Sequence, residues 1–362
     1  MLTLEAAVEI IVVETKVAAV IEVGGISSVV QYSGFDIIGD IHGCALSLEA
    51  LLKRLGYRSD SRGAGGKAFE DKVYYHPSRQ AVFTGDIIDR GARIREALHL
   101  VKNMVDTGSA HCVMGNHEYN ALAYTTETLD SAQYELPQYV REHNLQYQQQ
   151  ISSTLRQFEG HEQQWLLFLK WMYSLPAFLE LDGFRVVHAC WDEALIERFK
   201  TDKRVIDRQW IQETADQNSF AAHFMNRLTR GTGIQLPDGR HIDSSDGRKR
   251  RFFRTKFWSS NPQILQDVVY QPDPLPEDLA VTSLSQKQKQ SLLHYDETAV
   301  PVFFGHYWLS GQPSVQSTNV ACLDYSAVKN GRLAAYRFDG ECKLDANKIV
   351  WVDASIEYGS GL

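Results

Sequence analysis

Three stretches of the chain share one order: a short apolar run, a polar turn and an amphipathic segment. FDIIGD at 35–40 precedes 44–57, in which leucines recur with helical spacing up to Gly56. QAVFTGDIIDRG at 80–91 precedes the amphipathic segment 94–108, and HCVMGNHEYNALAY at 111–124 repeats the order. Three such units predict strands and helices that form a helix-covered sheet, with ligands bound at the carboxyl ends of the strands.

The rest of the chain predicts further strands and an insertion. GFRVVHACWD at 183–192 and VPVFFGHYW at 300–308 each predict a strand that ends at a histidine, and 319–328 and 332–338 predict closing strands. Glutamine-rich residues 127–175 have a largely helical pattern. We therefore expect a single domain over 34–355, with a helical insertion at about 119–175 and a cleft-shaping segment at about 200–300. Residues 1–33, rich in β-branched types, predict a β-rich extension that forms a hairpin or a dimerising arm.

Composition narrows the function classes. The 362 residues are 44% hydrophobic, enough for a large core, and the net charge of -8 argues against binding long nucleic acid. Five cysteines without a CxxC pair predict reduced thiols and a cytoplasmic location. The apolar N-terminal stretch lacks a basic region and is interrupted by charged residues, and no apolar run is long enough to span a membrane.

Metal-ligand residue types follow five of the predicted strands. These residues are Asp40 with His42, then Asp86, Asn116, His188 and His306. Side chains two residues apart in extended backbone share a face, so Asp40 and His42 can reach one ion together. Asp86 can bridge two ions, and the other three residues complete the second. The pattern predicts a centre of two divalent metals.

Five motifs carry a resemblance to a known family. GDIHG (39–43), GDIIDRG (85–91), GNHE (115–118), HAC (188–190) and GHYW (305–308) resemble the five blocks of the metallophosphoesterase (calcineurin-like) superfamily. The DRG at 89–91 resembles its bacterial phosphoprotein-phosphatase-like branch, which includes diadenosine tetraphosphate hydrolases. The resemblance implies a four-layered α/β/β/α sandwich with the metals at one edge. It also implies Asp40, His42 and Asp86 on one metal, and Asp86, Asn116, His188 and His306 on the other.

The resemblance gives roles to further residues. His117 is the matched candidate for the general acid, Asp89 would hold its imidazolium, and the Arg90 fork suits two phosphate oxygens. In this branch a second arginine between the last two metal histidines binds phosphate, and Arg230 and Arg254 both remain candidates. Asp324 is expected near the metals as a partner of a ligand histidine.

Other residues are expected to be structural. We expect Glu118 to support the backbone at a helix start and Trp191 and Trp308 to pack in the core. The basic run RKRRFFRTK at 248–256 is expected to be a solvated loop.

The leading hypothesis is a dinuclear-metal phosphatase that hydrolyses phosphomonoesters by in-line attack of a metal-bridging hydroxide. The alternative is hydrolysis of a phosphoanhydride in a dinucleotide polyphosphate or another small pyrophosphorylated metabolite. A catalytically silent binding module is disfavoured, because the complete ligand set is present. Manganese is the expected metal, with iron or zinc also suited to these ligands. The substrate is a phosphorylated small molecule or a phosphopeptide, and the N-terminal arm is a candidate for homo-oligomerisation.

Overall fold

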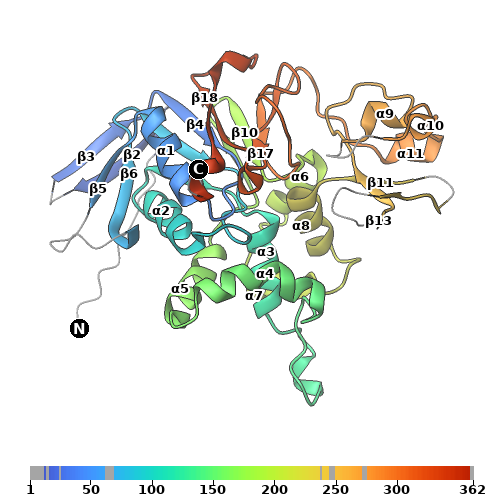
Figure 1. The fold of residues 1–362 in the computed structure, drawn as a ribbon, viewed down its shortest axis with the longest axis horizontal. Helices are drawn as coiled ribbons and strands as arrows, with labels where there is room; N and C mark the ends of the chain where they lie inside the picture. The colour runs from blue at the N-terminus through green and yellow to red at the C-terminus, as the bar shows by residue number, and fades with distance from the viewer. Residues whose placement is uncertain are drawn as a thin grey trace.

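Two β-sheets face each other at the centre of the molecule, with helices on their outer sides (Figure 1). The computed structural model describes residues 12–13, 16–23, 26–61, 69–236, 239–243, 249–270 and 275–358. Within these residues no helix is both long and apolar enough to cross a membrane. None of the five cysteines forms a disulfide, as the sequence predicts.

The first sheet contains the strands of the three predicted units. Its order is β17-β18-β4-β7-β8, and β19 also pairs with β18. The strands β4, β7 and β8 are parallel, whereas β18 runs antiparallel to β4. Their bounds are β4 Gly34–Ile38, β7 Arg79–Phe83, β8 Ala110–Cys112, β17 Asp324–Tyr325, β18 Arg332–Phe338 and β19 Ile349–Asp353.

The second sheet has the order β16-β15-β10-β9. The strands β10, β15 and β16 are parallel, so their carboxyl ends lie at one edge. Apolar rings from both sheets pack between them. The centre of the Phe184 ring of β10 lies 5.0 Å from that of Phe35 of β4 and 4.7 Å from that of Phe338 of β18. The bounds are β9 Phe178–Leu181, β10 Phe184–Val187, β15 Val302–Phe304 and β16 Val320–Cys322.

Helices cover the outer faces of both sheets, which confirms the predicted four-layered α/β/β/α sandwich. The helices of the three predicted units are α1 Ala45–Leu55, α2 Ile94–Asp106 and α3 Asn116–Thr125. The leucines of α1 face the core, and Gly56 ends this helix at a φ of 94° that favours glycine. The remaining helices of these layers are α4 Leu145–Gln157, α5 Glu162–Met172, α6 Glu193–Thr201, α7 Arg208–Glu213 and α8 Phe220–Arg230.

The segment that the sequence predicts to be a helical insertion is only partly helical. The helices α4 and α5 lie within it, but residues 127–144 form a loop with one short 3-10 turn, η2 Ser131–Gln133. Pro137 in this loop cannot donate a backbone hydrogen bond, and Asn144 caps the start of α4 by accepting from the backbone of Tyr147. Of the glutamine-rich segment 127–175, only the part after residue 144 contains α-helices.

Residues 233–292 build a small unit with its own buried apolar cluster, which includes Ile234, Phe253 and Leu279. In it β11 pairs with β14, and β12 with β13. Part of the basic run 248–256 lies in β13 and β14. The bounds are β11 Gly233–Gln235, β12 Ile242–Asp243, β13 Lys249–Arg250, β14 Phe252–Arg254, α9 Leu265–Val268, α10 Glu277–Ala280 and α11 Gln286–Ser291.

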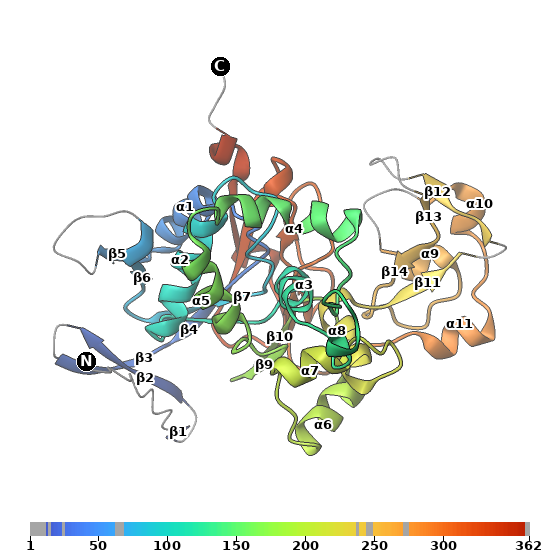
Figure 2. The same cartoon turned by 90° about the horizontal axis from the view of Figure 1, so that it is seen from below.

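A separate antiparallel sheet of β1, β2 and β3 lies at the other end of the molecule (Figure 2). It contains the hairpin expected in the N-terminal extension, whereas residues 1–11 fall outside the described part. The bounds are β1 Val12–Val13, β2 Lys16–Val23 and β3 Ile26–Gln31, and another pair is β5 Arg58–Ser61 with β6 Lys72–Tyr75. Further 3-10 turns are η1 Phe69–Asp71, η4 Ala327–Lys329, η5 Ala346–Lys348 and η6 Ala354–Tyr358.

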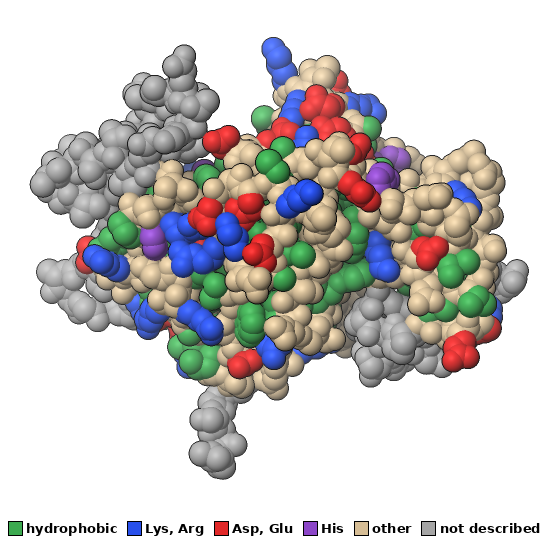
Figure 3. Space-filling view, turned by 90° about the horizontal axis from the view of Figure 1, so that it is seen from above, with side chains coloured by type: hydrophobic (Ala, Val, Ile, Leu, Met, Phe, Trp, Pro, Cys, Tyr) green, Lys and Arg blue, Asp and Glu red, His purple; other side chains and the backbone are tan. Residues whose placement is uncertain are grey.

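Acidic and basic side chains are interspersed on the face of the molecule shown in Figure 3. A protein that holds long nucleic acid gathers positive charge along one face. This face does not have that character, in line with the net negative charge of the chain.

Candidate active site and metal centre

The ends of strands from both sheets converge on one buried cluster of polar side chains. Asp40 follows β4, Asp86 follows β7, Asn116 begins α3 after β8, and His188 and His306 follow β10 and β15. Asp86 stands at the centre, because each of its carboxylate oxygens faces histidines from other elements. The structure thus brings together the residues that the sequence places at separate strand ends.

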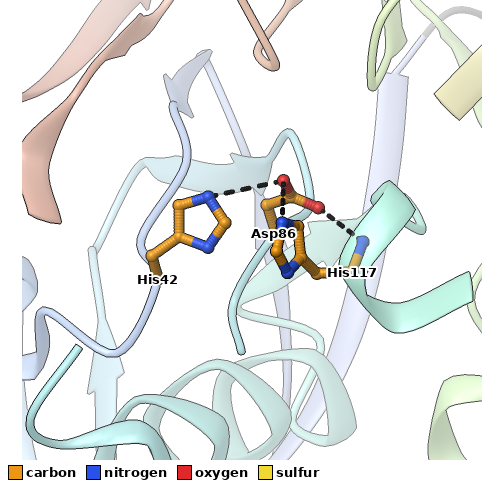
Figure 4. Close-up of side chains that lie close together, drawn as sticks. All are labelled: His42, Asp86 and His117. Atoms are coloured by element: carbon orange, nitrogen blue, oxygen red, sulfur yellow. Dashed lines mark hydrogen bonds and ion pairs between the residues drawn. The ribbon is translucent and has the colours of Figure 1, made fainter. Parts of the chain in front are cut away.

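Asp86 connects two groups of side chains. Its Oδ2 lies 3.4 Å from Nε2 of His42 and 3.9 Å from Nε2 of His117 (Figure 4). Its Oδ1 lies 3.4 Å from Nε2 of His188, and candidate ligand atoms of Asp86, His188 and His306 all lie within 4.8 Å of one another. A carboxylate with one oxygen in each group has the geometry of a ligand that bridges two ions.

The histidines present the nitrogens that a metal requires. Nδ1 of His42 donates to the backbone oxygen of Ile88 at 2.8 Å, and Nδ1 of His188 donates to that of Thr84 at 2.7 Å. Because a carbonyl can only accept, Nδ1 of each ring carries a proton, and Nε2 is the nitrogen that remains to face Asp86 and a metal ion. Nε2 of His306 is buried without a hydrogen-bond partner. These Nε2 atoms, together with the Asp86 carboxylate, are ligands of the kind that divalent metal ions bind.

Two more carboxylates lie buried beside this cluster. Asp40 accepts from the Thr84 hydroxyl at 3.2 Å and from the His306 amide at 3.0 Å. Burial, and then the charge of Asp324, raise the pKa of Asp40 well above its ordinary value. Asp324 accepts from the backbone amides of Trp308 and Ser326, at 2.8 and 3.0 Å, and not from a histidine ring. Bound cations would offset the charge of this acidic cluster.

His117 and Asp89 form a dyad at the edge of the cluster. Nδ1 of His117 lies 2.5 Å from Oδ2 of Asp89, whose other oxygen accepts from the Thr154 hydroxyl of α4. The guanidinium of Arg90 donates to Nε2 of His42 at 2.7 Å and to Nε2 of His117 at 3.0 Å. It also lies 4.0 Å from the centre of the Trp308 ring, which is half-buried instead of packed in the core as we expected. Trp191, by contrast, is buried as expected.

Several residues of the site adopt a left-handed backbone that non-glycine residues rarely use. Backbones of this kind persist where the surrounding structure fixes them, and they are frequent at functional sites. The φ angles are 43° for His42, 49° for Asp86, 69° for Asp89, 70° for Arg90 and 71° for His306.

Glu118 supports more backbone than the sequence predicts. Its carboxylate is fully buried and accepts from the amide of Gly115 at 3.0 Å, at the start of α3. It also accepts from the amides of Asp86, Ile87 and Ile88, at 2.9, 2.8 and 3.2 Å. One side chain therefore fixes the loop that carries Asp86 against the helix that carries His117.

Both candidate arginines of the later segment lie near the second group. Arg254 donates to the backbone oxygen of His306 at 2.8 Å. Burial, followed by the charge of Arg254, lowers the pKa of His306, and Arg230 contributes in the same direction. No feature of the sequence indicated that Thr154 supports Asp89, because the two residues lie on different elements, 65 positions apart in the chain.

Comparisons with known proteins agree with this geometry. The family model described as calcineurin-like phosphoesterase matches residues 34–306. The chain is 43% identical over 84 residues to the asymmetrical bis(5'-nucleosyl)-tetraphosphatase PrpE of Halalkalibacterium halodurans, a match that covers 23% of this chain and 30% of that protein. It is 26% identical over 318 residues to the symmetrical bis(5'-nucleosyl)-tetraphosphatase of Vibrio parahaemolyticus, covering 84% of this chain and 94% of that protein.

Among solved structures, a cold-active protein-tyrosine phosphatase of a psychrophilic Shewanella species is 17% identical, with a TM-score of 0.40, over 86% of this chain and 79% of that one. The family match covers most of the chain and includes the strand ends described above. The chain therefore belongs to the calcineurin-like phosphoesterases, metal-dependent phosphoric ester hydrolases that use two divalent metal ions.

Proposed function

We propose that the chain hydrolyses phosphomonoesters of small molecules with two bound divalent ions, manganese being the metal we expect, with iron or zinc also suited to these ligands. The observation that carries the proposal is the dyad of His117 and Asp89, whose nitrogen and oxygen lie 2.5 Å apart beside the Asp86 cluster. A phosphomonoester releases an alkoxide, a strong base that must be protonated as it leaves. The dyad supports this proton transfer.

The proposed ligands divide around Asp86. Asp40, His42 and Asp86 would hold one ion, and Asp86, Asn116, His188 and His306 the other. When bound, the ions lower the pKa of water to near neutrality and stabilise negative charge on the phosphoryl oxygens. The buried carboxylates in turn keep both ions in place.

The remaining residues would act on the phosphate and the leaving group. As an imidazolium, His117 would keep its Nδ1 proton against Asp89 and give its Nε2 proton to the departing oxygen. Arg90 would turn its planar fork from the two histidines to two phosphate oxygens. Arg254, fixed to the backbone of His306, is the second proposed phosphate-binding arginine.

A second candidate is hydrolysis of a phosphoanhydride in a nucleotide polyphosphate. It is supported by the alignment over 94% of the Vibrio relative, whose name is that of a symmetrical bis(5'-nucleosyl)-tetraphosphatase. The leaving group is then a phosphate, a far weaker base than an alkoxide, and it depends less on His117. The two candidate reactions therefore differ in how strongly their rates depend on His117.

The test compares substrates whose leaving groups differ in basicity. With manganese present, kcat/KM is measured for glycerol phosphate, para-nitrophenyl phosphate, a phosphoserine peptide and diadenosine tetraphosphate. We expect glycerol phosphate to be preferred, and His117→Asn to lower its kcat roughly 10²–10⁴-fold, with a much smaller loss on para-nitrophenyl phosphate. His223→Asn, at an exposed histidine of α8, is the matched control.

Two outcomes would change the conclusion. A preference for diadenosine tetraphosphate with little dependence on His117 would replace the leading proposal with the second candidate. Phosphate release at the wild-type rate by Asp86→Asn, with every substrate, would contradict both.

A further inference from the structure

A cleft on the surface of the molecule has no role in the mechanism described so far. Its volume is about 480 Å³, and it is lined by the loop after β15, by the turn that joins β17 to β18 and by residues of β18 and β19. Binding sites for small molecules have volumes of about 300–1,000 Å³. The cleft is therefore large enough for the organic part of a small phosphate ester.

One aromatic ring connects this cleft to the metal centre. Trp308 lines the cleft, and the guanidinium of Arg90 lies 4.0 Å from the centre of the Trp308 ring. Nζ of Lys329, which also lines the cleft, lies 4.0 Å from the same ring centre. Because Arg90 is the proposed phosphate-binding fork, a substrate whose phosphate contacts Arg90 has the cleft within reach of its leaving group.

The backbone holds the walls of the cleft in place. Trp308 has a φ of 58°, which is rare for a bulky residue, and its amide donates to Oδ2 of the buried Asp324 at 2.8 Å. The Ser326 hydroxyl donates to the backbone oxygen of Leu309 at 3.0 Å, which joins two walls of the cleft. The amide of Lys329 donates to the backbone oxygen of Ser326 at 2.8 Å. A cleft formed in advance loses little conformational entropy when a ligand binds.

The charged side chains that line the cleft favour an anion. They are Lys329, Arg332 and Asp353, so positive charges outnumber negative ones. Nε of Arg332 lies 3.3 Å from Oδ1 of Asp353, and this pair is neutral as a whole. The net charge of the lining therefore has the sign of Lys329, and the face of the Trp308 ring favours that cation.

We propose that the cleft binds the leaving group of the substrate and that Lys329 recognises a carboxylate on it. This inference rests on the proposed hydrolysis of small phosphomonoesters and narrows it to phosphate esters of hydroxy acids. Arg90 would hold the phosphate and Lys329 the carboxylate, so that the two cations beside the Trp308 ring bind the two ends of one short molecule. The reaction is unchanged: water attacks phosphorus, the bond from phosphorus to the ester oxygen breaks, and His117 protonates that oxygen as the hydroxy acid leaves.

The first experiment compares two substrates that differ at one carbon. Glycerol 3-phosphate has a CH₂OH group where 3-phosphoglycerate has a carboxylate, and the two molecules are otherwise the same. We expect kcat/KM of the wild type to be about fivefold or more higher for 3-phosphoglycerate. This substrate should therefore exceed even glycerol phosphate, the preferred substrate of the comparison above.

Variants of Lys329 assign this preference to the cleft. Lys329→Met keeps an unbranched side chain and removes the charge, and Lys329→Arg keeps the charge. We expect Lys329→Met to lower kcat/KM for 3-phosphoglycerate about fivefold or more beyond its effect on glycerol 3-phosphate, and Lys329→Arg to retain most of the preference. Lys287→Met, at an exposed lysine of α11, is the matched control and should change the ratio less than about twofold.

The second experiment measures binding instead of turnover. The manganese-loaded His117→Asn variant lacks the proposed general acid, so both esters persist while calorimetric titration gives their Kd values. We expect 3-phosphoglycerate to bind more tightly than glycerol 3-phosphate. The double variant that also carries Lys329→Met should bind the two esters equally.

The outcomes distinguish this inference from the proposed function. Equal kcat/KM and Kd values for the two esters would overturn the inference while leaving the phosphatase proposal intact. A preference for 3-phosphoglycerate that persists in Lys329→Met would place the carboxylate on the metal ions and would also overturn it. If the wild type hydrolyses neither ester, the proposed function fails, and the titration still decides whether Lys329 recognises a carboxylate.

Discussion

Glu118 shows how much of the site depends on a single side chain that does not face the substrate. Its two oxygens accept from four backbone amides, one at the start of α3 and three in the loop 86–88. That loop adopts a left-handed backbone at Asp86, which costs free energy unless other contacts fix it. The position of the carboxylate that we propose to bridge the two metals is therefore set by Glu118, the residue after His117.

Replacing Glu118 by glutamine tests this role. The amide group places an N–H donor against backbone donors, so at least one buried amide loses its acceptor. We expect Glu118→Gln to lower the free energy of unfolding by about 2–4 kcal/mol and to weaken manganese binding. Urea unfolding and metal titration measure the two effects. Glu159→Gln, at an exposed position, is the control, and equal stabilities for the two variants would contradict the role.

At the scale of elements, one carboxylate connects three neighbouring strands of the first sheet. Asp36 of β4 is fully buried and accepts from Nε of Arg79 on β7 at 3.1 Å and from Nε of Arg337 on β18 at 3.1 Å. Arg79 also donates to the backbone oxygens of Phe35 and Phe338. Asp36 is the middle residue of β4 and Arg79 the first residue of β7, whereas Asp40 follows the carboxyl end of β4.

Breaking this network should affect stability more than chemistry. Asp36→Asn leaves Arg79 buried without its full charge partner, and we expect a loss of about 3–5 kcal/mol in the free energy of unfolding. We expect kcat/KM of the folded variant to remain within about threefold of the wild type, because the proposed metal ligands lie beyond the carboxyl ends of the strands.

The surface pair of Asp353 and Arg332 provides the control. Asp353→Asn should cost less than about 1 kcal/mol, since both side chains are solvated. If the two variants lose equal stability in urea unfolding, the network does not connect the strands as described.

The sequence predicts local elements better than their pairing. Each of α1, α2 and α3 follows from apolar periodicity after a turn, because that signal lies within a dozen residues. The strand β19 was missed, although its pairing with β18 completes the sheet, since pairing partners lie far apart in the chain. The two-sheet sandwich came from the family motifs, because periodicity alone does not say which strands share a sheet.

The same distinction applies within the site. Asp40, Asp86, His188 and His306 were predicted because each directly follows a strand within a recognisable motif. The contacts from α4 that support Asp89 and Arg90 were not predicted: the Thr154 hydroxyl donates to Asp89, and the backbone amide of Arg90 donates to the Ser153 hydroxyl at 2.7 Å. These contacts depend on how α4 packs, and nothing in the glutamine-rich segment signals them.

For the whole molecule, the N-terminal sheet raises the question of association. The strands β1, β2 and β3 form a sheet of their own, and in the described residues none of them pairs with a strand of the sandwich. Its outer strands therefore present unpaired backbone groups, which favour pairing with another copy. The sheet lies at one end of the molecule, whereas α3, which begins with Asn116 and His117, lies near its centre (Figure 2).

Deleting residues 1–31 tests that association. We expect the full chain to sediment as a dimer and the truncated chain as a monomer, with kcat/KM changed less than about twofold since the strand ends of the sandwich are intact. Analytical ultracentrifugation over a range of concentrations measures the mass. An unchanged mass would remove the N-terminal sheet as a dimerisation element without affecting the site.

Metal binding should also contribute to the stability of the whole molecule. Burial, and then the charges of Asp324 and Asp86, raise the pKa of Asp40 well above its usual value, so a charged Asp40 opposes folding until cations are bound. An ion that binds only the folded chain adds about 2.7 kcal/mol at a concentration 100 times its Kd. We therefore expect chelation to lower Tm of the wild type and manganese to restore it, as thermal unfolding would show.

Asp86→Asn makes this prediction specific to the proposed centre. The variant lacks the bridging carboxylate, so manganese should raise its Tm much less than that of the wild type. In chelator the variant should not exceed the wild type in Tm, because the charges of His188 and His117 outweigh burial and hold the pKa of Asp86 well below its usual range, which stabilises the ionised carboxylate in the folded chain. A wild-type Tm unaffected by chelation, in a chain shown by elemental analysis to have lost its metal, would mean that these carboxylates are compensated by the protein itself. The metals would then serve catalysis without contributing to the fold.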